Sequence, residues 1–417
     1  MNITKNLSRK IKAVLLSSAP IYIDVNDGST VKGWAASSAN KTASVVVCIS
    51  SKSDCVCLLA DKYRPDVRRV GLHDTGFCGY EYDVSLWKDK AITVSVQAIP
   101  DVKMNTDFSP SFFVHIPKTA GTSFKRAAES FFGKGGIVKN YGVKSIETAH
   151  WVKDTVLQEK DYPALYQRLK VEGIGLYTGH IHALPTAHVF PIRNVVTFVR
   201  RPQAQVLSHY HHYARWYGYE KTIEDFVKNL GFRNLQSRHL KGLPLQLVGF
   251  IGLTEKYDES IRLYNSYSGF NLEVREDNIN SHNSATEVSD ELSALIADHN
   301  KEDNVLYGQA VSLLNERSRL AKSGQDWCFS FIDRLDENAV TGVAYMQSDN
   351  KPVSLVIKHG GVVIDRCVAN GFRPGLVQFG VPNKGFVGFS FPLPARFDHR
   401  DISVEVELTG QILQRKF

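Results

Sequence analysis

The stretch that decides the fold of the central part of the chain is Phe112-Phe113-Val114-His115-Ile116-Pro117-Lys118-Thr119-Ala120-Gly121-Thr122-Ser123. Its first five residues form an apolar run that is typical of a short buried strand. Apolar residues then recur at the spacing of one helix face, at Phe124, Ala127, Ala128, Phe131 and Phe132. The stretch is therefore predicted to join a strand to a helix.

The loop between this strand and this helix has the composition of an anion site. Gly121 permits a close backbone approach, and the start of the helix offers free N–H groups. Lys118, Thr122 and Ser123 add donors, so we predict a cradle for a phosphate-like group. It is not the Walker pattern, because the Lys precedes the Gly. An ordinary helix that is capped by Thr or Ser is the alternative.

A second junction of this kind follows along the chain. Val195-Val196-Thr197-Phe198-Val199 is a buried-type strand, and Pro202 suits the first turn of a helix. Arg200 ends the strand and Ser208 lies two helical turns further on. Ligands bind at this edge of open α/β sheets, so these two residues are predicted to hold one further phosphate. Without the first motif, Arg200 would be interpreted as part of a surface ion pair.

Strands and helices alternate through the centre of the chain. Helical spacing dominates again from Ser289 to Leu320. Such alternation predicts a parallel sheet that is covered on both faces.

Two segments outside this centre resemble each other. Five sets of residues recur 309 positions later: Gly33-Trp34-Ala35 as Gly342-Val343-Ala344, Val45-Val46-Val47 as Ser354-Leu355-Val356, Arg64-Pro65 as Arg373-Pro374, Gly76-Phe77 as Gly385-Phe386, and Gly79-Tyr80 as Gly388-Phe389. A one-residue insertion then aligns 92–96 with 402–406. Each copy consists of short alternating runs that are divided by Gly, Asn, Asp and Pro. This pattern predicts an antiparallel β-sandwich in each copy.

The two junction motifs together resemble the carbohydrate sulfotransferases that use 3′-phosphoadenosine 5′-phosphosulfate (PAPS). The resemblance covers about 108–322 and includes 234–238, 252–260 and 303–307. It implies that the first loop binds the 5′-phosphosulfate through Lys118, Thr119, Ala120, Gly121, Thr122 and Ser123. It implies that Arg200 and Ser208 bind the 3′-phosphate. Two positions depart from the family pattern: Arg201 stands where Asp is usual, and Gln205 where a second Arg is common.

Gly179-His180-Ile181-His182 precedes the second junction. Histidine titrates near neutral pH, which suits a base for an acceptor hydroxyl. The similar glycosaminoglycan sulfotransferases have Gly-His here with that His as their base, so the resemblance implies that His180 is the catalytic base. His182 would orient the substrate or share the role, and Lys118 would also stabilise leaving-group charge. A structural role for either histidine is the alternative.

No metal site is expected. His209 and His212 have a spacing that occurs in zinc sites, but no third and fourth ligand are apparent. Cys55-Val56-Cys57 lacks a matching pair or His spacing, so zinc there is a minor alternative to buried free thiols in a reducing compartment. The basic N-terminus resembles a signal peptide, but its apolar stretch Ala13-Val14-Leu15-Leu16 is short. We therefore expect a cytoplasmic protein.

The chain has 417 residues, of which 43% are hydrophobic and 22% charged, and its net charge is +7. This composition is that of a globular protein, and the charge is too small to indicate a nucleic-acid partner. We predict an α/β protein with a parallel-sheet, nucleotide-binding sulfotransferase domain at 105–322. Two all-β, sandwich-like repeat domains would flank it at 20–104 and 323–417, after an N-terminal segment at 1–19.

The expected reaction transfers the sulfuryl group of PAPS to a glycan hydroxyl, with no metal, no nucleic acid and no integral membrane segment. The oligomeric state is left open. One alternative is a nucleotide-dependent phosphotransferase, but the sequence offers no convincing Walker lysine with a Mg²⁺-holding carboxylate. Another is a glycan-binding protein with a degenerate transferase core, against which the intact Lys118, Arg200, Ser208 and His180 argue. Aromatic residues of the repeats could stack on sugars, although those of small sandwiches usually belong to the core: Trp34, Tyr63, Trp87 and Tyr345.

Overall fold

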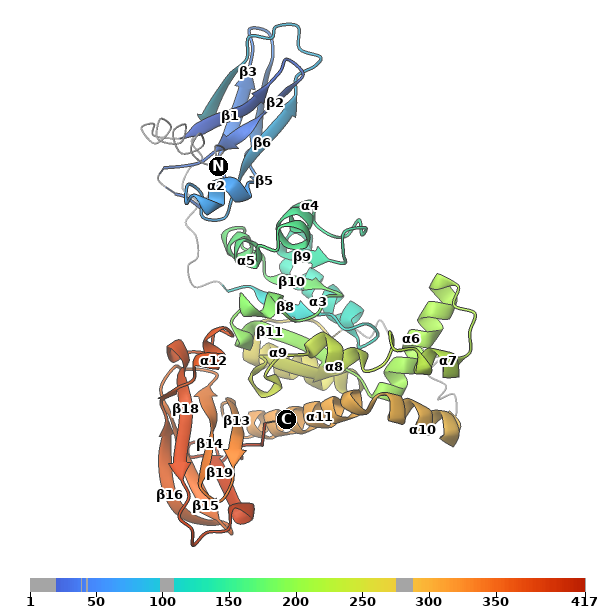
Figure 1. The fold of residues 1–417 in the computed structure, drawn as a ribbon, viewed down its shortest axis with the longest axis vertical. Helices are drawn as coiled ribbons and strands as arrows, with labels where there is room; N and C mark the ends of the chain where they lie inside the picture. The colour runs from blue at the N-terminus through green and yellow to red at the C-terminus, as the bar shows by residue number, and fades with distance from the viewer. Residues whose placement is uncertain (1–19, 39, 43, 98–108, 275–287, 417) are drawn as a thin grey trace, which may run out of the picture. The chain divides into compact units, whose positions relative to one another are not determined.

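The computed structural model describes residues 20–38, 40–42, 44–97, 109–274 and 288–416. The chain forms two compact units, the first within residues 1–109 and 142–174 and the second within 110–141 and 175–417. It is a mixed α/β protein with one parallel sheet and four antiparallel sheets among the described residues (Figure 1). The predicted segment 1–19 and the predicted boundary at 104/105 lie outside the described residues, and the domain boundaries remain a prediction.

The parallel sheet belongs to the second unit. Its five strands stand in the order β12 (Phe250–Leu253), β11 (Val195–Val199), β8 (Ser111–Val114), β10 (Leu176–Gly179) and β9 (Ile137–Asn140). All four pairings are parallel, as predicted, and every residue of β8, β10, β11 and β12 is buried. The chain runs from β8 to one side of the sheet and later crosses to β11 on the other side. The carboxyl end of β8 is therefore the switch point at which open α/β sheets bind ligands.

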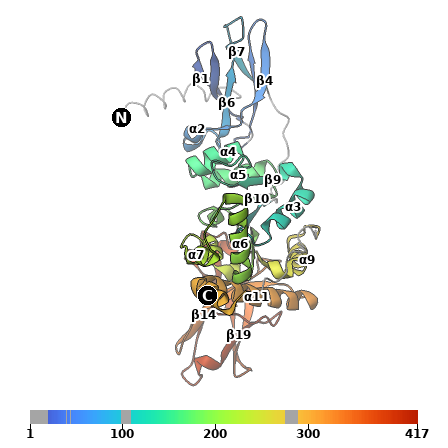
Figure 2. The same ribbon diagram turned by 90° about the vertical axis from the view of Figure 1, so that its right-hand side faces the viewer.

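Helices flank this sheet. The two junction motifs form the predicted helices α3 (Gly121–Phe132) and α6 (Pro202–Tyr217), with Pro202 in the first turn. α9 (Tyr257–Ser268) and α11 (Lys301–Lys322) pack against β12 (Figure 2). α7 (Ile223–Lys228), α8 (Leu235–Leu240) and α10 (Asp290–His299) complete the second unit's longer helices.

The stretch from Ser289 to Leu320, where helical spacing was predicted, contains two helices, α10 and α11. The break between α10 and α11 is Asn300, which has non-helical backbone angles of φ −129° and ψ 40°. The Asn300 side chain accepts a hydrogen bond from the Asn234 amide at 2.9 Å and donates one to the Ile296 carbonyl at 2.9 Å. The Asn300 side chain thus hydrogen-bonds to the backbone of the segment at Asn234, and α10 ends at this contact.

The N-terminal β segment, residues 20–97, has two antiparallel sheets. One contains β1 (Ile21–Asn26), β2 (Thr30–Ala35), β6 (Phe77–Asp83) and β5 (Lys62–Tyr63), and the other contains β4 (Cys55–Leu59), β3 (Val46–Ser50) and β7 (Thr93–Gln97). Val31 of the first sheet and Val47 and Ile49 of the second are fully buried in one hydrophobic cluster. The alternation along these strands therefore places one face of each sheet in a shared core.

The C-terminal β segment, residues 328–416, has the same strand order. One sheet contains β13 (Cys328–Leu335), β14 (Ala339–Met346), β18 (Phe386–Pro392) and β17 (Gly371–Phe372), and the other contains β16 (Val362–Ala369), β15 (Val353–His359) and β19 (Ile402–Val406). Val340, Leu355 and Ile357 are fully buried between them.

Pairings in the two four-stranded sheets recur 309 positions apart. Gly33 lies opposite Tyr80, and Gly342 lies opposite Phe389. Each first strand has a bulge at the matching place, and a matching arginine–aspartate ion pair follows: Arg64 with Asp24, and Arg373 with Asp333. Gly76 and Gly385 both have positive φ and both precede a strand.

The offset of 309 is wrong for one strand. The inward-facing residues at β3 are Val47 and Ile49, with Val45 just before the strand, whereas those of β15 are Val353, Leu355 and Ile357, which lie 308 positions after Val45, Val47 and Ile49. The hairpin from β15 to β16 then contains one residue more than that from β3 to β4, since Ile49 pairs with Val56 but Ile357 pairs with Asp365. Because side chains alternate between faces, a shift of one residue decides which set is buried.

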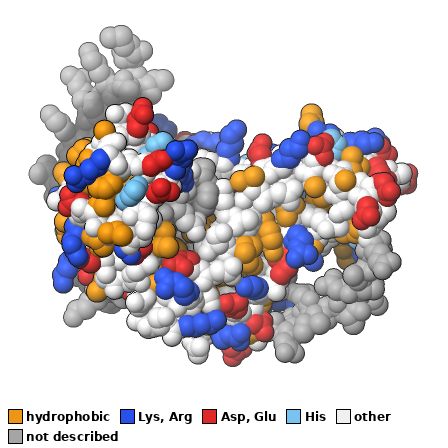
Figure 3. Space-filling model, turned by 90° about the horizontal axis from the view of Figure 1, so that it is seen from below, with side chains coloured by type: hydrophobic (Ala, Val, Ile, Leu, Met, Phe, Trp, Pro, Cys, Tyr) orange, Lys and Arg blue, Asp and Glu red, His pale blue; other side chains and the backbone are white. Residues whose placement is uncertain are grey.

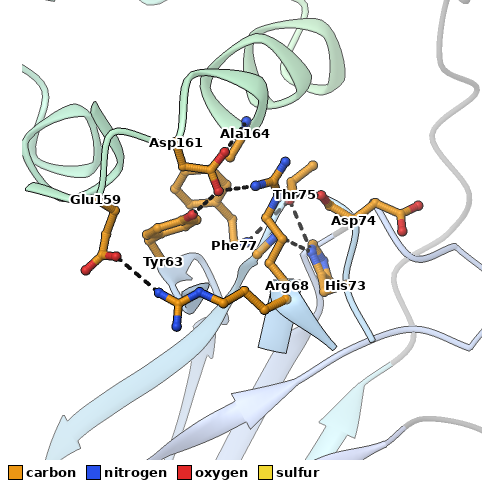
Figure 4. A network of polar contacts seen from close by, with 11 residues as sticks. Tyr63, Arg68, His73, Asp74, Thr75, Phe77, Glu159, Asp161 and Ala164 are labelled. Atoms are coloured by element: carbon orange, nitrogen blue, oxygen red, sulfur yellow. Dashed lines mark hydrogen bonds and ion pairs between the residues drawn. The ribbon is translucent and has the colours of Figure 1, made fainter. Parts of the chain in front are cut away.

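The first unit also contains α4 (His150–Val152) and α5 (Tyr162–Val171). Asp161 caps α5 by accepting from the Ala164 amide, and it also accepts hydrogen bonds from Tyr63 and Arg68 of the N-terminal β segment (Figure 4). The Arg168 guanidinium of α5 lies 4.0 Å from the centroid of the Phe77 ring. These contacts attach α5 to the β segment within one compact unit.

The expectation of buried free thiols at Cys55 and Cys57 is wrong, because Cys57 is in a disulfide and Cys55 is free but exposed. Cys48 of β3 and Cys57 of β4 are directly opposite each other and form a disulfide, while Cys55, Cys78, Cys328 and Cys367 are free. The sequence does not reveal this pairing because it depends on the register between the two strands. A disulfide is typical of an oxidising compartment, which argues against the reducing one that we expected.

The described residues contain no helix that is long and apolar enough to cross a membrane. On the face of the molecule in Figure 3, Lys and Arg side chains are interspersed with Asp and Glu and do not form one basic patch.

Candidate active site

The loop from β8 to α3 has an unusual backbone that exposes the start of the helix. Lys118 and Ala120 have positive φ values of 67° and 65°. Thr119 is buried and donates its hydroxyl to the Ile116 carbonyl at 3.0 Å, which fixes the turn. The N-cap residue of α3 is Ala120, and no side chain caps the helix. The helix capped by Ser or Thr, our alternative interpretation of this motif, is therefore not what forms.

Gly121 allows His115 to pack on the start of α3. A Cβ atom at Gly121 would lie 1.9 Å from Cδ2 of the His115 ring, so no larger residue fits. His115 is buried, and its Nδ1 lies 3.2 Å from the Tyr141 hydroxyl. Burial, and then the nearby His180 and Lys125, lower the pKa of His115 to about 2. The imidazole is therefore neutral at physiological pH.

Lys118 and Arg200 come together at the carboxyl edge of the sheet. An Arg200 guanidinium nitrogen, Nη1, lies 3.4 Å from the Lys118 carbonyl oxygen, to which it donates. Burial lowers the pKa of Lys118, and the neighbouring Arg200 lowers it further. Burial also lowers the pKa of Arg200. Neither side chain lies within ion-pair distance of a carboxylate in the described part of the chain, although the more distant Glu255 carboxylate opposes the effect of burial on the pKa of Arg200. A bound anion would relieve both the desolvation and the repulsion.

Arg200 is held by residues that we did not predict. Its amide donates to Gln236 Oε1 at 2.8 Å, and Gln236 Nε2 donates to its carbonyl at 2.9 Å. Asp303 accepts in turn from the Gln236 amide at 3.1 Å and from the Ser237 amide at 2.7 Å. The segments 234–238 and 303–307, which resemble family segments, thus support the second junction. Single residues of this kind have no signal in one sequence, because the contacts join distant positions.

The two departures from the family pattern have structural partners. Gln205 is buried and its Nε2 donates to the Pro117 carbonyl at 3.1 Å, so a neutral side chain ties α6 to the first loop. The Arg201 side chain is exposed, and its amide donates to Glu255 Oε1 at 2.8 Å. Position 201, where the family usually has Asp, therefore places no carboxylate next to Arg200, and neither does position 205.

His180 follows β10 directly and is exposed. Its ring centroid lies 4.3 Å from that of His115 and 4.9 Å from that of Tyr141, edge to face in both cases. His182 is also exposed, but its Nδ1 lies 2.9 Å from the Arg238 carbonyl, and its ring stacks on His239 at 5.0 Å. His182 is thus anchored to α8, whereas His180 belongs to the cluster beside the first loop.

The remaining predicted binding residues lie on the two helices. At the start of α3, Thr122 is exposed and Ser123 is buried. Ser208 is partly buried on α6, and Ala120 forms the N-cap of α3.

The histidines of α6 do not form a metal centre with a third ligand. Among the described residues no group of three or more His, Cys, Asp or Glu side chains could hold a metal ion. His209 packs instead among aromatic rings, with centroids 4.9 Å from Tyr213 and 5.4 Å from Phe226. Burial lowers the pKa of His209 to about 4.

Comparisons with known proteins add little to this geometry. No protein-family model matches the chain, and no curated protein matches it. Among solved structures, the chain is similar to the mouse sulfotransferase SULT7A1 complexed with PAP, at 14% identity and a TM-score of 0.27. The match covers 47% of this chain and 66% of that chain, which is just under two thirds of its length. At this TM-score the similarity does not support an assignment of fold or function.

Proposed function

We propose that the protein is a sulfotransferase that moves the sulfuryl group of PAPS to a hydroxyl of a glycan. The observation that carries the proposal is the meeting of Lys118 and Arg200 at the switch point of a parallel sheet. Both cations are partly desolvated and adjacent to an uncapped helix start. Such a site suits a ligand with phosphate groups at both ends of one nucleotide.

The residues present fit PAPS. The loop of Lys118, Thr119, Ala120, Gly121, Thr122 and Ser123 would hold the 5′-phosphosulfate, through backbone N–H groups and the Lys118 ammonium. Arg200 and Ser208 would hold the 3′-phosphate. Gln205, which donates to Pro117, and Gln236, which brackets the Arg200 backbone, would keep the two halves in register. PAPS, when bound, supplies the electrophilic sulfuryl group.

His180 is our candidate for the base that takes the proton of the acceptor hydroxyl. Its neighbour His115 has a pKa lowered by burial to about 2, so it stays neutral. It therefore adds no positive charge beside an imidazole that must become protonated. Lys118 would stabilise the negative charge that develops on the departing bisphosphate. His182, which is anchored to the Arg238 carbonyl, would orient the acceptor.

The glycan acceptor, the repeat nature of the β segments and the location are further parts of the proposal. We propose that 20–104 and 323–417 are two copies of one β-sandwich repeat that flank a transferase domain at 105–322. The matching pairings 309 positions apart support this. Such repeats resemble accessory modules beside glycan-modifying transferases. A cytoplasmic location has no support of this kind, because the Cys48–Cys57 disulfide favours an oxidising compartment.

Transfer of label from ³⁵S-PAPS to a panel of polysaccharides and glycolipids tests the proposal. We expect one or more glycans to become labelled and the label to be lost with Lys118→Ala. Lys134→Ala, which removes an exposed lysine just after α3, is the matched control and should transfer normally. Binding of PAP without transfer to any glycan would contradict the glycan acceptor, and absence of PAP binding would contradict the sulfotransferase assignment.

A further inference from the structure

The outer faces of the two four-stranded sheets are closed differently. In the N-terminal β segment a hydrophobic cluster covers this face, with Trp34 and Val67 as its largest members. Trp34 lies opposite Tyr22 across β1 and β2, and their rings stack at 6.3 Å. The face is therefore filled by the segment's own side chains.

The matching face of the C-terminal β segment is hollow. Position 343, which matches Trp34, is Val343, and it lies opposite Phe331 across β13 and β14. The smaller side chain leaves out one aromatic ring. A groove of about 470 Å³ opens here, and its lining includes Phe331, Val343, Arg373, Leu376, Phe379 and Lys416. This volume lies within the range of small-ligand sites, roughly 300–1,000 Å³.

The matching arginines also differ in their partners. In the N-terminal segment Arg64 binds two carboxylates, those of Asp24 and Asp66. Arg373 binds Asp333 and the Gly342 carbonyl, but the position that matches Asp66 is Gly375. Arg373 therefore keeps one carboxylate partner where its counterpart has two, and it lines the groove.

A second cation lies at the same groove. The Lys416 ammonium is 5.5 Å from the centroid of the Phe331 ring, which forms part of the floor. Arg373 and Lys416 face one carboxylate, that of Asp333, among the residues that line the groove. A groove whose accessible apolar residues are Pro374 and Leu376, with excess positive charge at its side, complements a sugar ring that bears an anionic group.

One wall of the groove packs against the segment that follows His182. This wall is 242–244, which follows α8. A Cβ atom on Gly242 would lie 2.5 Å from Leu184, and the Ala183 amide donates to the His239 carbonyl of α8 at 2.7 Å. The chain from His182 to Leu184 therefore connects this wall to the proposed active site.

From these observations we propose that the groove between 242–244 and the C-terminal β segment binds an acidic polysaccharide as the acceptor. The anionic groups of the chain contact Arg373 and Lys416, and its sugar rings lie against Pro374 and Leu376, the accessible apolar residues of the lining. That the bound glycan is the acceptor rests on the proposed function. Binding of an acidic glycan in the groove does not depend on the proposed function.

The test introduces at position 375 a carboxylate like that of Asp66, which holds the matching position in the N-terminal β segment. Gly375 has no atom within 4 Å of a built Cβ and no positive φ, so Gly375→Asp should fold normally. Gly375→Asn is the matched control, because it has the same size without the charge. Lys416→Ala is the second variant, with Lys351→Ala as its control on an exposed lysine of the same segment. Calorimetry would measure binding of hexasaccharides from hyaluronan, alginate and chondroitin sulfate to the full chain, with maltohexaose as the neutral probe.

We expect an acidic hexasaccharide to bind more tightly than maltohexaose. Gly375→Asp and Lys416→Ala should each weaken that binding about tenfold or more, the usual effect of losing a hydrogen bond to a charged group, and the two controls should not. Equal binding of acidic and neutral probes, or equal affinities of Gly375→Asp and Gly375→Asn, would overturn the proposal. PAP affinity, measured on the same variants, should be unchanged. Absence of PAP binding by the wild-type chain, with an acidic hexasaccharide still bound in the groove, would contradict the sulfotransferase assignment and leave the groove proposal standing.

Discussion

Lys118 and Arg200 illustrate how two residues 82 positions apart create one electrostatic site. Lys118 lies in the loop after β8, Arg200 directly follows β11, and these two buried strands are neighbours in the sheet. Parallel strands bring their carboxyl ends to one edge, so burial and mutual repulsion both act on the pair. A dianionic ligand removes this cost when it binds.

We predict that Lys118→Ala and Arg200→Ala each weaken binding of the bisphosphate product PAP. The expected loss is about 1.5–3 kcal/mol for each charged hydrogen bond that is removed. Titration calorimetry measures it directly. Arg201→Ala is the control, because it removes the same charge from the adjacent, exposed position. If all three variants bind PAP as the wild type does, neither residue contacts a phosphate.

His180 should be essential for turnover and not for nucleotide binding. We expect His180→Ala to lower kcat by roughly two to four orders of magnitude, the usual contribution of a general base, while PAP affinity stays the same. His182→Ala should have a smaller effect on kcat, because the Arg238 carbonyl and His239 hold the His182 ring against α8.

The pH dependence of kcat identifies the base independently. A base must be unprotonated to act, so activity should fall toward acid pH as His180 becomes protonated. His115 cannot cause a fall near neutral pH, because burial lowers its pKa to about 2. An active His180→Ala variant together with an inactive His182→Ala variant would show that His182 is the base. If both stay active, an acidic residue of the acceptor cleft is the next candidate.

At the scale of elements, features that depend on neighbouring residues were predicted, whereas features that depend on contacts between distant segments were not. The strand β11 and the start of α6 at Pro202 are confirmed because both depend on neighbouring residues. The break at Asn300, the Gln236–Arg200 bracket and the offset of 308 at β15 were missed. Each of these depends on a contact between distant segments, or on the length of one hairpin. One sequence contains no record of such contacts.

The disulfide between β3 and β4 should be present in the purified protein and should stabilise the N-terminal β segment. In denaturant without reductant we expect four reactive thiols, from the four free cysteines, and six after reduction. Cys57→Ser should lower the free energy of unfolding by about 2–3 kcal/mol, because the unfolded chain regains the entropy of a closed loop. Cys55→Ser, at an exposed thiol of the same strand, is the control. Six reactive thiols before reduction would restore our first expectation.

At the scale of the whole molecule, the fold class could be predicted and the acceptor could not. The parallel sheet and the antiparallel sheets of both β segments follow from periodicity and from the offset of 309. The groove at Phe331 and Arg373 does not, although its cause is visible in the sequence as Val343 and Gly375 at positions that match Trp34 and Asp66. Substitutions of this kind acquire meaning only when the structure shows which face each position occupies.

Three histidines of the second unit are buried in neutral form, and together they should make the protein acid-labile. Burial lowers the pKa of His115 to about 2 and the pKa values of His209 and His239 to about 4. The unfolded chain binds these protons near pH 6.5, where the folded chain does not. The unfolded state thus holds more protons, so the free energy of unfolding falls as the pH decreases below about 6.5.

We expect a loss of up to about 2 kcal/mol for each such histidine between pH 7 and pH 5, which urea unfolding at the two pH values measures. His209→Phe should reduce this pH dependence, since a ring that does not titrate would fill the same site beside Tyr213 and Phe226. His211→Phe is the control, because it makes the same substitution at an exposed histidine of the same helix. Equal pH dependence in the two variants would mean that His209 is protonated in the folded protein. The aromatic cluster around His209 would then have to contain a group that stabilises the positive charge of the imidazolium.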